Sequence, residues 1–204
     1  MIVQAKARVI KANTRPMASL RPCHHTKQHH SMSNTSPSII THEALETLSG
    51  KAQTVARLRA NLNVHPQLED PIQRLFNAME PGTYVRPHRH ARKNGWELMM
   101  CIKGAFSILL FDDSGTVLNR IDLDSSAGNL AVEIPAFAWH IVVSHRPGTV
   151  MFEVKPGPYT VVDDKDFAAW APPEFDPSTE RFRLWYATAQ AGDQAPPWKP
   201  ASNR

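Results

Sequence analysis

Cysteine is scarce in this chain of 204 residues, and long apolar runs are absent. Only Cys23 and Cys101 occur, which excludes a disulfide framework and favours a reducing, cytoplasmic location. No apolar run approaches the ~20 residues that a helix needs to cross a bilayer, so the sequence predicts neither an integral membrane protein nor a membrane partner. Glycine is sparse, at nine residues, whereas seventeen prolines favour many turns between short strands.

Acidic residues are missing from the first 31 positions, which hold six Lys or Arg residues. Because the whole chain has a formal charge of +4, residues 32–204 carry the difference, a formal charge of −2. A mildly acidic folded region without a helix-turn-helix pattern argues against a nucleic-acid partner. Residues 1–37 lack hydrophobic periodicity and are expected to form a disordered basic extension, which fits a transit peptide as well as an upstream or mis-assigned start.

Short strands with turn signals between them dominate the chain after Pro71. The pattern predicts eight strands, at about 72–79, 83–90, 96–103, 105–111, 116–123, 130–134, 139–144 and 149–155. Eight such strands favour an all-β fold of the double-sheet jelly-roll type. The length allows one domain, expected over residues 38–186, followed by a disordered tail over residues 187–204.

A helical segment is predicted ahead of the strands. Its apolar positions are Leu45, Leu48, Val55 and Leu58. Thr41 is the candidate N-cap, and Glu43 in the first turn is favoured by the helix dipole. Gly50 is expected to interrupt or end the first part of this segment. At the other end of the domain, a Pro- and Trp-rich segment from Tyr159 to Trp185 is expected to pack across the barrel.

Histidines at strand spacing mark a candidate metal site. His88 and His90 are two residues apart, so in a strand both side chains point to one face. Glu97 follows a tight connection containing Asn94-Gly95 and is expected on the neighbouring antiparallel strand, while His140 adds a third imidazole from a distant strand. Three histidines and one glutamate suit one divalent transition metal ion per chain, with iron, manganese, nickel, cobalt and zinc all open.

The spacing of these residues resembles the two motifs of the cupin superfamily. Gly82, His88-x-His90, Glu97 and Gly104 resemble the first motif, and Pro135-x-Phe137-x-x-His140 resembles the second. The gap between His90 and Glu97 is about two residues longer than the common pattern, which implies a wider hairpin. Phe137 stands where the second motif usually has glycine.

Several phrases look like the WbuC family, cupin-fold metalloproteins found with polysaccharide and O-antigen biosynthesis genes. They include Gln73-Arg-Leu-Phe-Asn77, Trp96-Glu97, Phe152-Glu-Val-Lys155 and Trp170-Ala-Pro-Pro-Glu174, and the resemblance covers roughly residues 38–186. It implies a cupin-type barrel and a metal-dependent enzyme acting on a small polar ligand such as a sugar or nucleotide-sugar. The alternative is a non-catalytic, metal-assisted sensor or binding protein, and a homodimer is possible in either case.

Residues near the metal ligands are candidates for ligand binding and catalysis. Arg86 shares the parity of the metal histidines and could bind an anionic substrate or form a surface salt bridge. Glu153 and Lys155 share one strand face, which is either a solvated charged face or part of a pocket. The family resemblance favours substrate binding by Glu153 and catalysis by Lys155 and Tyr159. His65, beside Pro66, is expected to be a loop histidine.

Overall fold

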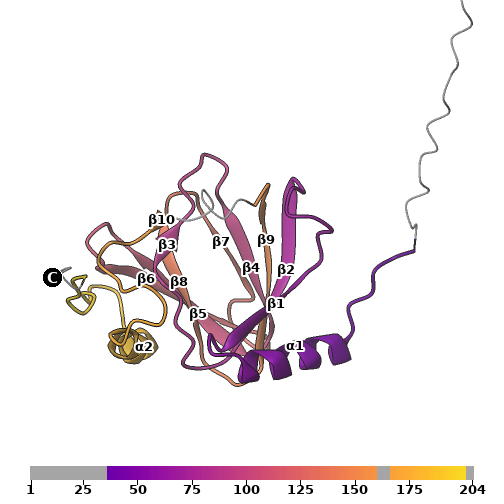
Figure 1. Ribbon diagram of the computed structural model, residues 1–204, viewed down its shortest axis with the longest axis horizontal. Coiled ribbons are helices and arrows are strands. Elements are labelled where there is room, and N and C mark those ends of the chain that lie inside the picture. The colour runs from indigo at the N-terminus through magenta and orange to yellow at the C-terminus, as the bar shows by residue number, and fades with distance from the viewer. Residues whose placement is uncertain (1–35, 160–165, 201–204) are drawn as a thin grey trace, which may run out of the picture. The chain divides into compact units, whose positions relative to one another are not determined.

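Two five-stranded antiparallel sheets face each other in the computed structural model, which describes residues 36–159 and 166–200; the compact unit begins at Ile39 (Figure 1). The first sheet has the order β1 (Arg59–Asn63), β2 (Ile72–Met79), β9 (Thr149–Pro156), β4 (Glu97–Lys103), β7 (Ala131–Ile134). The second has the order β10 (Asp166–Phe167), β3 (His88–Arg89), β8 (Trp139–Ser144), β5 (Ala105–Phe111), β6 (Val117–Asp124). The predicted all-β fold of the double-sheet jelly-roll type is confirmed.

The helix α1 (His42–Thr54) begins where the sequence predicts, because the Thr41 hydroxyl accepts a hydrogen bond from the N–H of Ala44 at 3.2 Å. Gly50 lies inside this helix and does not end it, so that expectation was wrong. The helix survives Gly50 because Leu45, Leu48 and Ala52 bury its apolar face against the first sheet.

Gly50→Ala is expected to raise the free energy of unfolding by about 0.5–1 kcal/mol, the helix-propensity difference between the two residues. A Cβ atom built at Gly50 meets nothing within 4 Å, so the methyl group fits without a clash. Urea denaturation measures the change. Gly104→Ala is the matched control and should destabilise, because its φ is +80° and the added Cβ would lie 2.4 Å from Thr149 Oγ1. A loss of stability in Gly50→Ala would contradict the open space that the structure shows around Gly50.

The predicted helical segment does not extend to Leu58. Val55 ends the helix in an extended conformation, Leu58 has a left-handed φ of 54°, and β1 follows at Arg59. Within the predicted strand 83–90, only His88–Arg89 forms ladder pairs. The short β10 and the helix α2 (Thr179–Thr188) are further elements that the periodicity did not predict.

The buried apolar side chains of the described residues form three clusters, of which the one between α1 and the first sheet is given above. One cluster lies between the sheets and includes Met99, Phe106, Ile108, Leu123 and Val142. A second covers the outer face of β5 and β8, where Phe182 and Tyr186 of α2 pack on Leu109 and Ile141. Because β5 is covered on both faces, its sequence is almost continuously apolar rather than alternating.

Residues that follow α2 pack onto the second sheet. Ala189 and Ala195 are buried in the cluster beneath α2, and the Val117 N–H donates to Asp193 O at 2.9 Å. The sequence suggested a disordered tail over residues 187–204, whereas these described residues are hydrogen-bonded and packed. Among the described residues, neither helix is long and apolar enough to cross a membrane.

Candidate metal centre and its cavity

Four side chains meet inside the barrel. His88 lies in β3 directly opposite His140 of β8, His90 follows β3, and Glu97 begins β4. One potential ligand atom from each residue lies within 4.8 Å of the other three, and all four side chains are buried. The sequence-predicted set His88, His90, Glu97 and His140 therefore forms one cluster that could hold a metal ion.

Glu97 reaches the cluster from the opposite sheet. β3 pairs with β8 and β10, whereas β4 pairs with β9 and β7, so the expectation that Glu97 lies on the strand neighbouring the histidine strand was wrong. The residues after His90 cross between the sheets and are not a wide hairpin. Gly95 permits this crossing, because a Cβ there would lie 2.7 Å from the His90 carbonyl oxygen.

Backbone carbonyls fix the orientation of two imidazoles. Nδ1 of His88 lies 2.9 Å from the Arg86 carbonyl oxygen, and Nδ1 of His140 lies 2.9 Å from that of Ala138. A carbonyl only accepts, so both Nδ1 atoms carry the hydrogen and the Nε2 lone pairs remain for ligation in the neutral rings. This carbonyl–histidine arrangement is typical of metal-binding histidines.

The Glu97 carboxylate faces imidazole nitrogens on both of its oxygens. Its Oε1 lies 2.7 Å from His90 Nε2, and its Oε2 lies 3.1 Å from His140 Nε2. Since His140 Nε2 presents a lone pair, two acceptors face one another unless a cation or a proton lies between them. The donor set and its orientation thus fit a divalent metal ion.

Lys155 connects the cluster to a second carboxylate. Its Nζ lies 3.2 Å from Glu97 Oε1 and 3.0 Å from Glu153 Oε1, and Glu153 Oε2 accepts from Asn77 Nδ2 at 2.7 Å. Burial by itself would raise the pKa of Glu97, but the Lys155 ammonium and the contacts with His140 and His90 hold that pKa well below its ordinary value. Lys155 and Glu153 are only 6% and 7% exposed, so the alternative of a solvated charged face is excluded.

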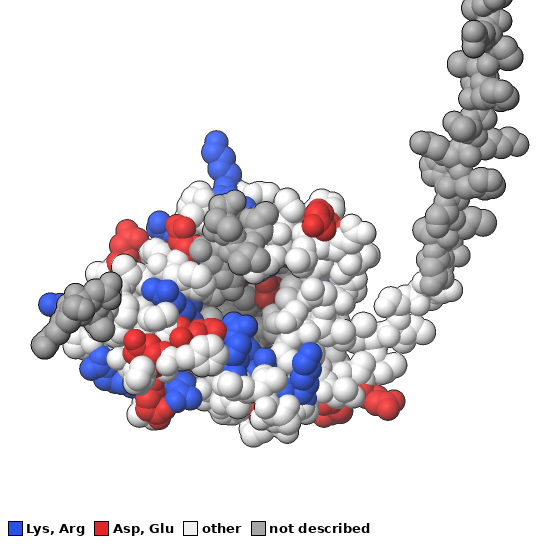
Figure 2. All heavy atoms as spheres, in the orientation of Figure 1, with Lys and Arg blue, Asp and Glu red and all other residues white. Residues whose placement is uncertain are grey.

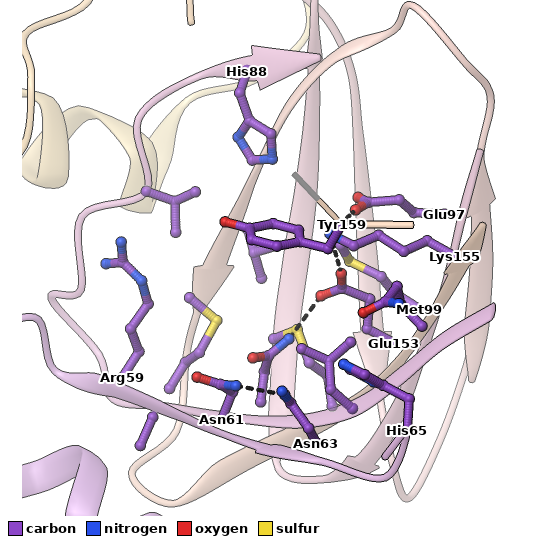
Figure 3. Close-up of a pocket in the computed structure, with 18 of the residues that line it drawn as sticks. Arg59, Asn61, Asn63, His65, His88, Glu97, Met99, Glu153, Lys155 and Tyr159 are labelled. Carbon is purple, nitrogen blue, oxygen red and sulfur yellow. Dashed lines mark hydrogen bonds and ion pairs between the residues drawn. The ribbon is translucent and has the colours of Figure 1, made fainter. Parts of the chain in front are cut away.

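A cavity of about 350 Å³ opens beside the cluster and includes His88 and Glu97 in its wall. Its floor is the inner face of the first sheet, where alternate residues of β1, β2, β9 and β4 point inward (Figure 3). Lys155, Glu153 and Tyr159 line this cavity as well. Figure 2 shows this face of the molecule hollowed, with Lys and Arg side chains gathered on one side of the hollow.

Two arginines differ in their relation to the cavity. Arg86 is not among its lining residues; its guanidinium donates to Ala168 O at 3.2 Å and lies 5.1 Å from the centre of the Phe167 ring. Arg59 lines the cavity but pairs with Glu174 of the C-terminal segment. Burial, and secondarily Arg57, lowers the pKa of Arg59 to about 10. The structure therefore does not place Arg86 in the cavity wall, and substrate binding by Arg86 stays a prediction.

Sequence reasoning missed the polar residues of the cavity wall on the first two strands. Asn61, Asn63 and His65 lie two residues apart, and all three line the cavity together with Asn77. The parity argument that located His88 and His90 could have found them, but the region was assigned to a helical segment and a loop. His65 is buried, with 5% exposure, and is a wall residue of the cavity.

Phe137 occupies the glycine position of the second motif with a φ of +67°, which explains why glycine is usual there. Phe137→Gly is expected to raise the free energy of unfolding by about 0.5–1 kcal/mol, which is the ~1–2 kcal/mol of left-handed strain less the backbone entropy that glycine loses. The ring is 50% exposed, so its removal costs little packing. Thermal or urea unfolding measures the gain, and Phe137→Ala, which keeps the Cβ atom, should show none. An equal gain in both variants would exclude backbone strain as the cause.

Comparison with known proteins gives a partial family match and distant structural matches. The family model described as "Domain of unknown function (DUF6016)" matches residues 40–123, and no protein with a curated description matches. Among solved structures, the chain is similar to KdgF from Halomonas sp., at 18% identity over 51% of this chain and 84% of that chain, with a TM-score of 0.39. A cupin superfamily protein from Desulfitobacterium hafniense DCB-2 matches at 17% identity over 48% of this chain and 76% of that chain, with a TM-score of 0.37. A mutant of Bacillus subtilis oxalate decarboxylase OxdC matches at 14% identity over 55% of this chain but 28% of that chain, with a TM-score of 0.41.

Proposed function

We propose that this protein is a metal-dependent enzyme that acts on a small polar molecule, such as a sugar or nucleotide-sugar of surface polysaccharide biosynthesis. The observation that supports the enzyme proposal is the shared wall of cluster and cavity, because His88 and Glu97 belong to both. A ligand in the cavity would therefore reach the ion that the cluster could hold. The polysaccharide context rests on the sequence resemblance to the WbuC family alone.

The chain offers two groups that could move a proton to or from such a ligand. Lys155 places its Nζ between Glu97 and Glu153 at the cavity wall, and Tyr159 adds a hydroxyl group. A bound divalent ion would polarise a ligand oxygen and leave positions for it beside four protein ligands. Glu153 would orient the ammonium of Lys155 and could accept a hydrogen bond from a ligand hydroxyl.

The test is metal analysis of the purified chain, followed by a turnover screen of monosaccharides and nucleotide-sugars. His24, His25, His29 and His30 are near the N-terminus and could bind adventitious metal, so a variant with these four changed to Asn is the matched control. We expect one ion per chain in both proteins. A metal content that falls to zero in the control would contradict the proposed centre.

Turnover separates the enzyme from the sensor alternative. If a substrate is found, Lys155→Ala and Tyr159→Phe should reduce turnover while the metal content stays unchanged, because neither residue belongs to the four-residue cluster. A sugar that raises the thermal midpoint of the metal-loaded protein without forming product would support the sensor instead. Unchanged turnover in both variants would remove Lys155 and Tyr159 from the proposed chemistry.

A further inference from the structure

Several neutral polar side chains of β1 and β2 line the cavity beside Arg59. Asn61 of β1 lies directly opposite Asn77 of β2, and Asn61 Nδ2 donates to Asn63 Oδ1 at 2.7 Å. Leu62, between Asn61 and Asn63, packs in the cluster with α1 instead. We call Asn61, Asn63 and Asn77 the amide wall; its members reach the cavity by the same strand alternation that places Glu153 and Lys155 in it (Figure 3).

His65 stands beside the amide wall with one nitrogen committed to the backbone. His65 Nδ1 lies 3.0 Å from the Arg74 nitrogen, whose N–H can donate to it, and 2.9 Å from the Arg74 carbonyl oxygen, which can accept from it. Either tautomer of the neutral ring is therefore held by the backbone, and Nε2 either donates or accepts. The buried Nε2 atom has no hydrogen-bond partner among the described residues, and Figure 3 shows the ring directed into the cavity.

The chemistry of this wall differs from that of the metal end of the cavity. Glu97, Glu153 and Lys155 bring charges to the metal end, and Arg57 and Arg59, both paired with Glu174, add two more charges to the wall. The amide wall and His65 bring neutral donors and acceptors. An amide both donates and accepts, and a neutral imidazole nitrogen does one or the other, which matches the hydroxyl groups of a polyol. Apart from imidazoles, Tyr159 is the only aromatic ring among the described residues that line the cavity, so the wall offers no pair of such rings to hold a nucleobase between them.

We infer that the cavity takes a single-ring, polyhydroxylated ligand, whose hydroxyls form hydrogen bonds with the amide wall and with His65 Nε2. The cavity of about 350 Å³ lies near the lower limit of the ~300–1,000 Å³ common for small-molecule sites, which favours one sugar ring over a nucleotide-sugar. The inference rests on the proposed function, since it names the substrate class of the same site. It makes His65 a specificity-determining residue for that ligand.

The test is calorimetric binding of D-glucose, D-galactose and D-glucuronate to the full-length, metal-loaded protein. UDP-glucose and tetrahydropyran, a ring without hydroxyls, are the comparison probes. His65→Asn keeps an oxygen near the position of Nδ1 for the Arg74 N–H but removes Nε2 and its hydrogen bond with the ligand. We expect at least one monosaccharide to bind and His65→Asn to weaken it about tenfold, the effect of losing one hydrogen bond. His42→Asn, at an exposed histidine of α1, should leave the affinity unchanged.

A nitrogen-detected NMR spectrum of the imidazoles adds a measurement that does not depend on the variant's folding. The Nε2 signal of the wild-type His65 ring should shift when the monosaccharide binds. Equal affinity in wild type and His65→Asn, an unshifted Nε2 signal, binding of UDP-glucose alone, or no binding of any monosaccharide would overturn the inference. If the purified chain holds no metal but binds a monosaccharide in a way that depends on His65, the proposed function fails and this inference stands. If the chain holds stoichiometric metal but binds no monosaccharide, this inference fails and the metal centre stands.

Discussion

His140→Ala is expected to abolish stoichiometric metal binding and to leave the jelly roll folded. The imidazole is buried, its Nδ1–H is fixed by the Ala138 carbonyl, and its Nε2 faces Glu97. Loss of a residue that only hydrogen-bonds to a metal ligand lowers metal affinity by ~10–100-fold. Loss of a ligand itself should therefore lower metal affinity by more than about 100-fold. Metal analysis after dialysis measures the loss, and far-ultraviolet circular dichroism reports the fold.

The fold should persist because the ligands come from strands that are paired independently of the ion. β8 keeps its ladder with β5 from Trp139 to Ser144, and Ile141 and Val143 pack on the outer cluster. His145→Ala is the matched control: this histidine directly follows β8 but lies outside the four-residue cluster, with Nε2 2.5 Å from Ser107 Oγ. It should retain the ion. Stoichiometric metal in His140→Ala, or equal loss in both variants, would contradict the assigned centre.

The metal cluster could be predicted from the sequence because strand parity is a local property. His88 and His90 share a face whatever sheet they join, and His140 stands at the start of an apolar run that reads as a strand. The sheet to which Glu97 belongs was not predictable in this way, since a short gap is compatible with a hairpin and with a crossing between sheets. The crossing depends on contacts distant in sequence, such as the pairing of β4 with β9.

One further expectation from the sequence was wrong, and one alternative stayed open, because contacts distant in sequence decide the outcome. Leu58 fits the helical spacing of the preceding segment, yet its left-handed backbone and the pairing of β1 with β2 overrule that periodicity. Glu153 and Lys155 look like a solvated face because a strand alone does not reveal what lies opposite it. Their burial follows from the second sheet and from the mutual neutralisation of an acid and a base, which lowers the cost of desolvation. In this chain the local sequence pattern therefore predicts most strands, but it does not predict what covers each face of a strand.

Lys155→Met is expected to lower the free energy of unfolding by about 3–5 kcal/mol in the metal-free protein, the usual cost of leaving a buried charge without its partner. The ammonium lies between two buried carboxylates, and its loss exposes Glu97 and Glu153 to each other without the intervening positive charge. Methionine has a similar length, so the cavity left behind is small. Urea denaturation of the metal-free and metal-loaded forms measures the effect.

The size of this loss should depend on the metal and on the second carboxylate. A divalent ion bound by Glu97 would replace part of the missing positive charge, so Lys155→Met should cost less in the metal-loaded protein. Lys155→Met combined with Glu153→Gln should also be less destabilised than Lys155→Met alone, because a neutral amide can still accept from Asn77 Nδ2. A single variant within about 0.5 kcal/mol of wild type, the range of ordinary surface substitutions, would show that the ammonium is not held between two buried carboxylates. Equal losses in the single and double variants, with no loss in Glu153→Gln alone, would instead attribute the cost to packing, because the coupling between Lys155 and Glu153 would then be zero.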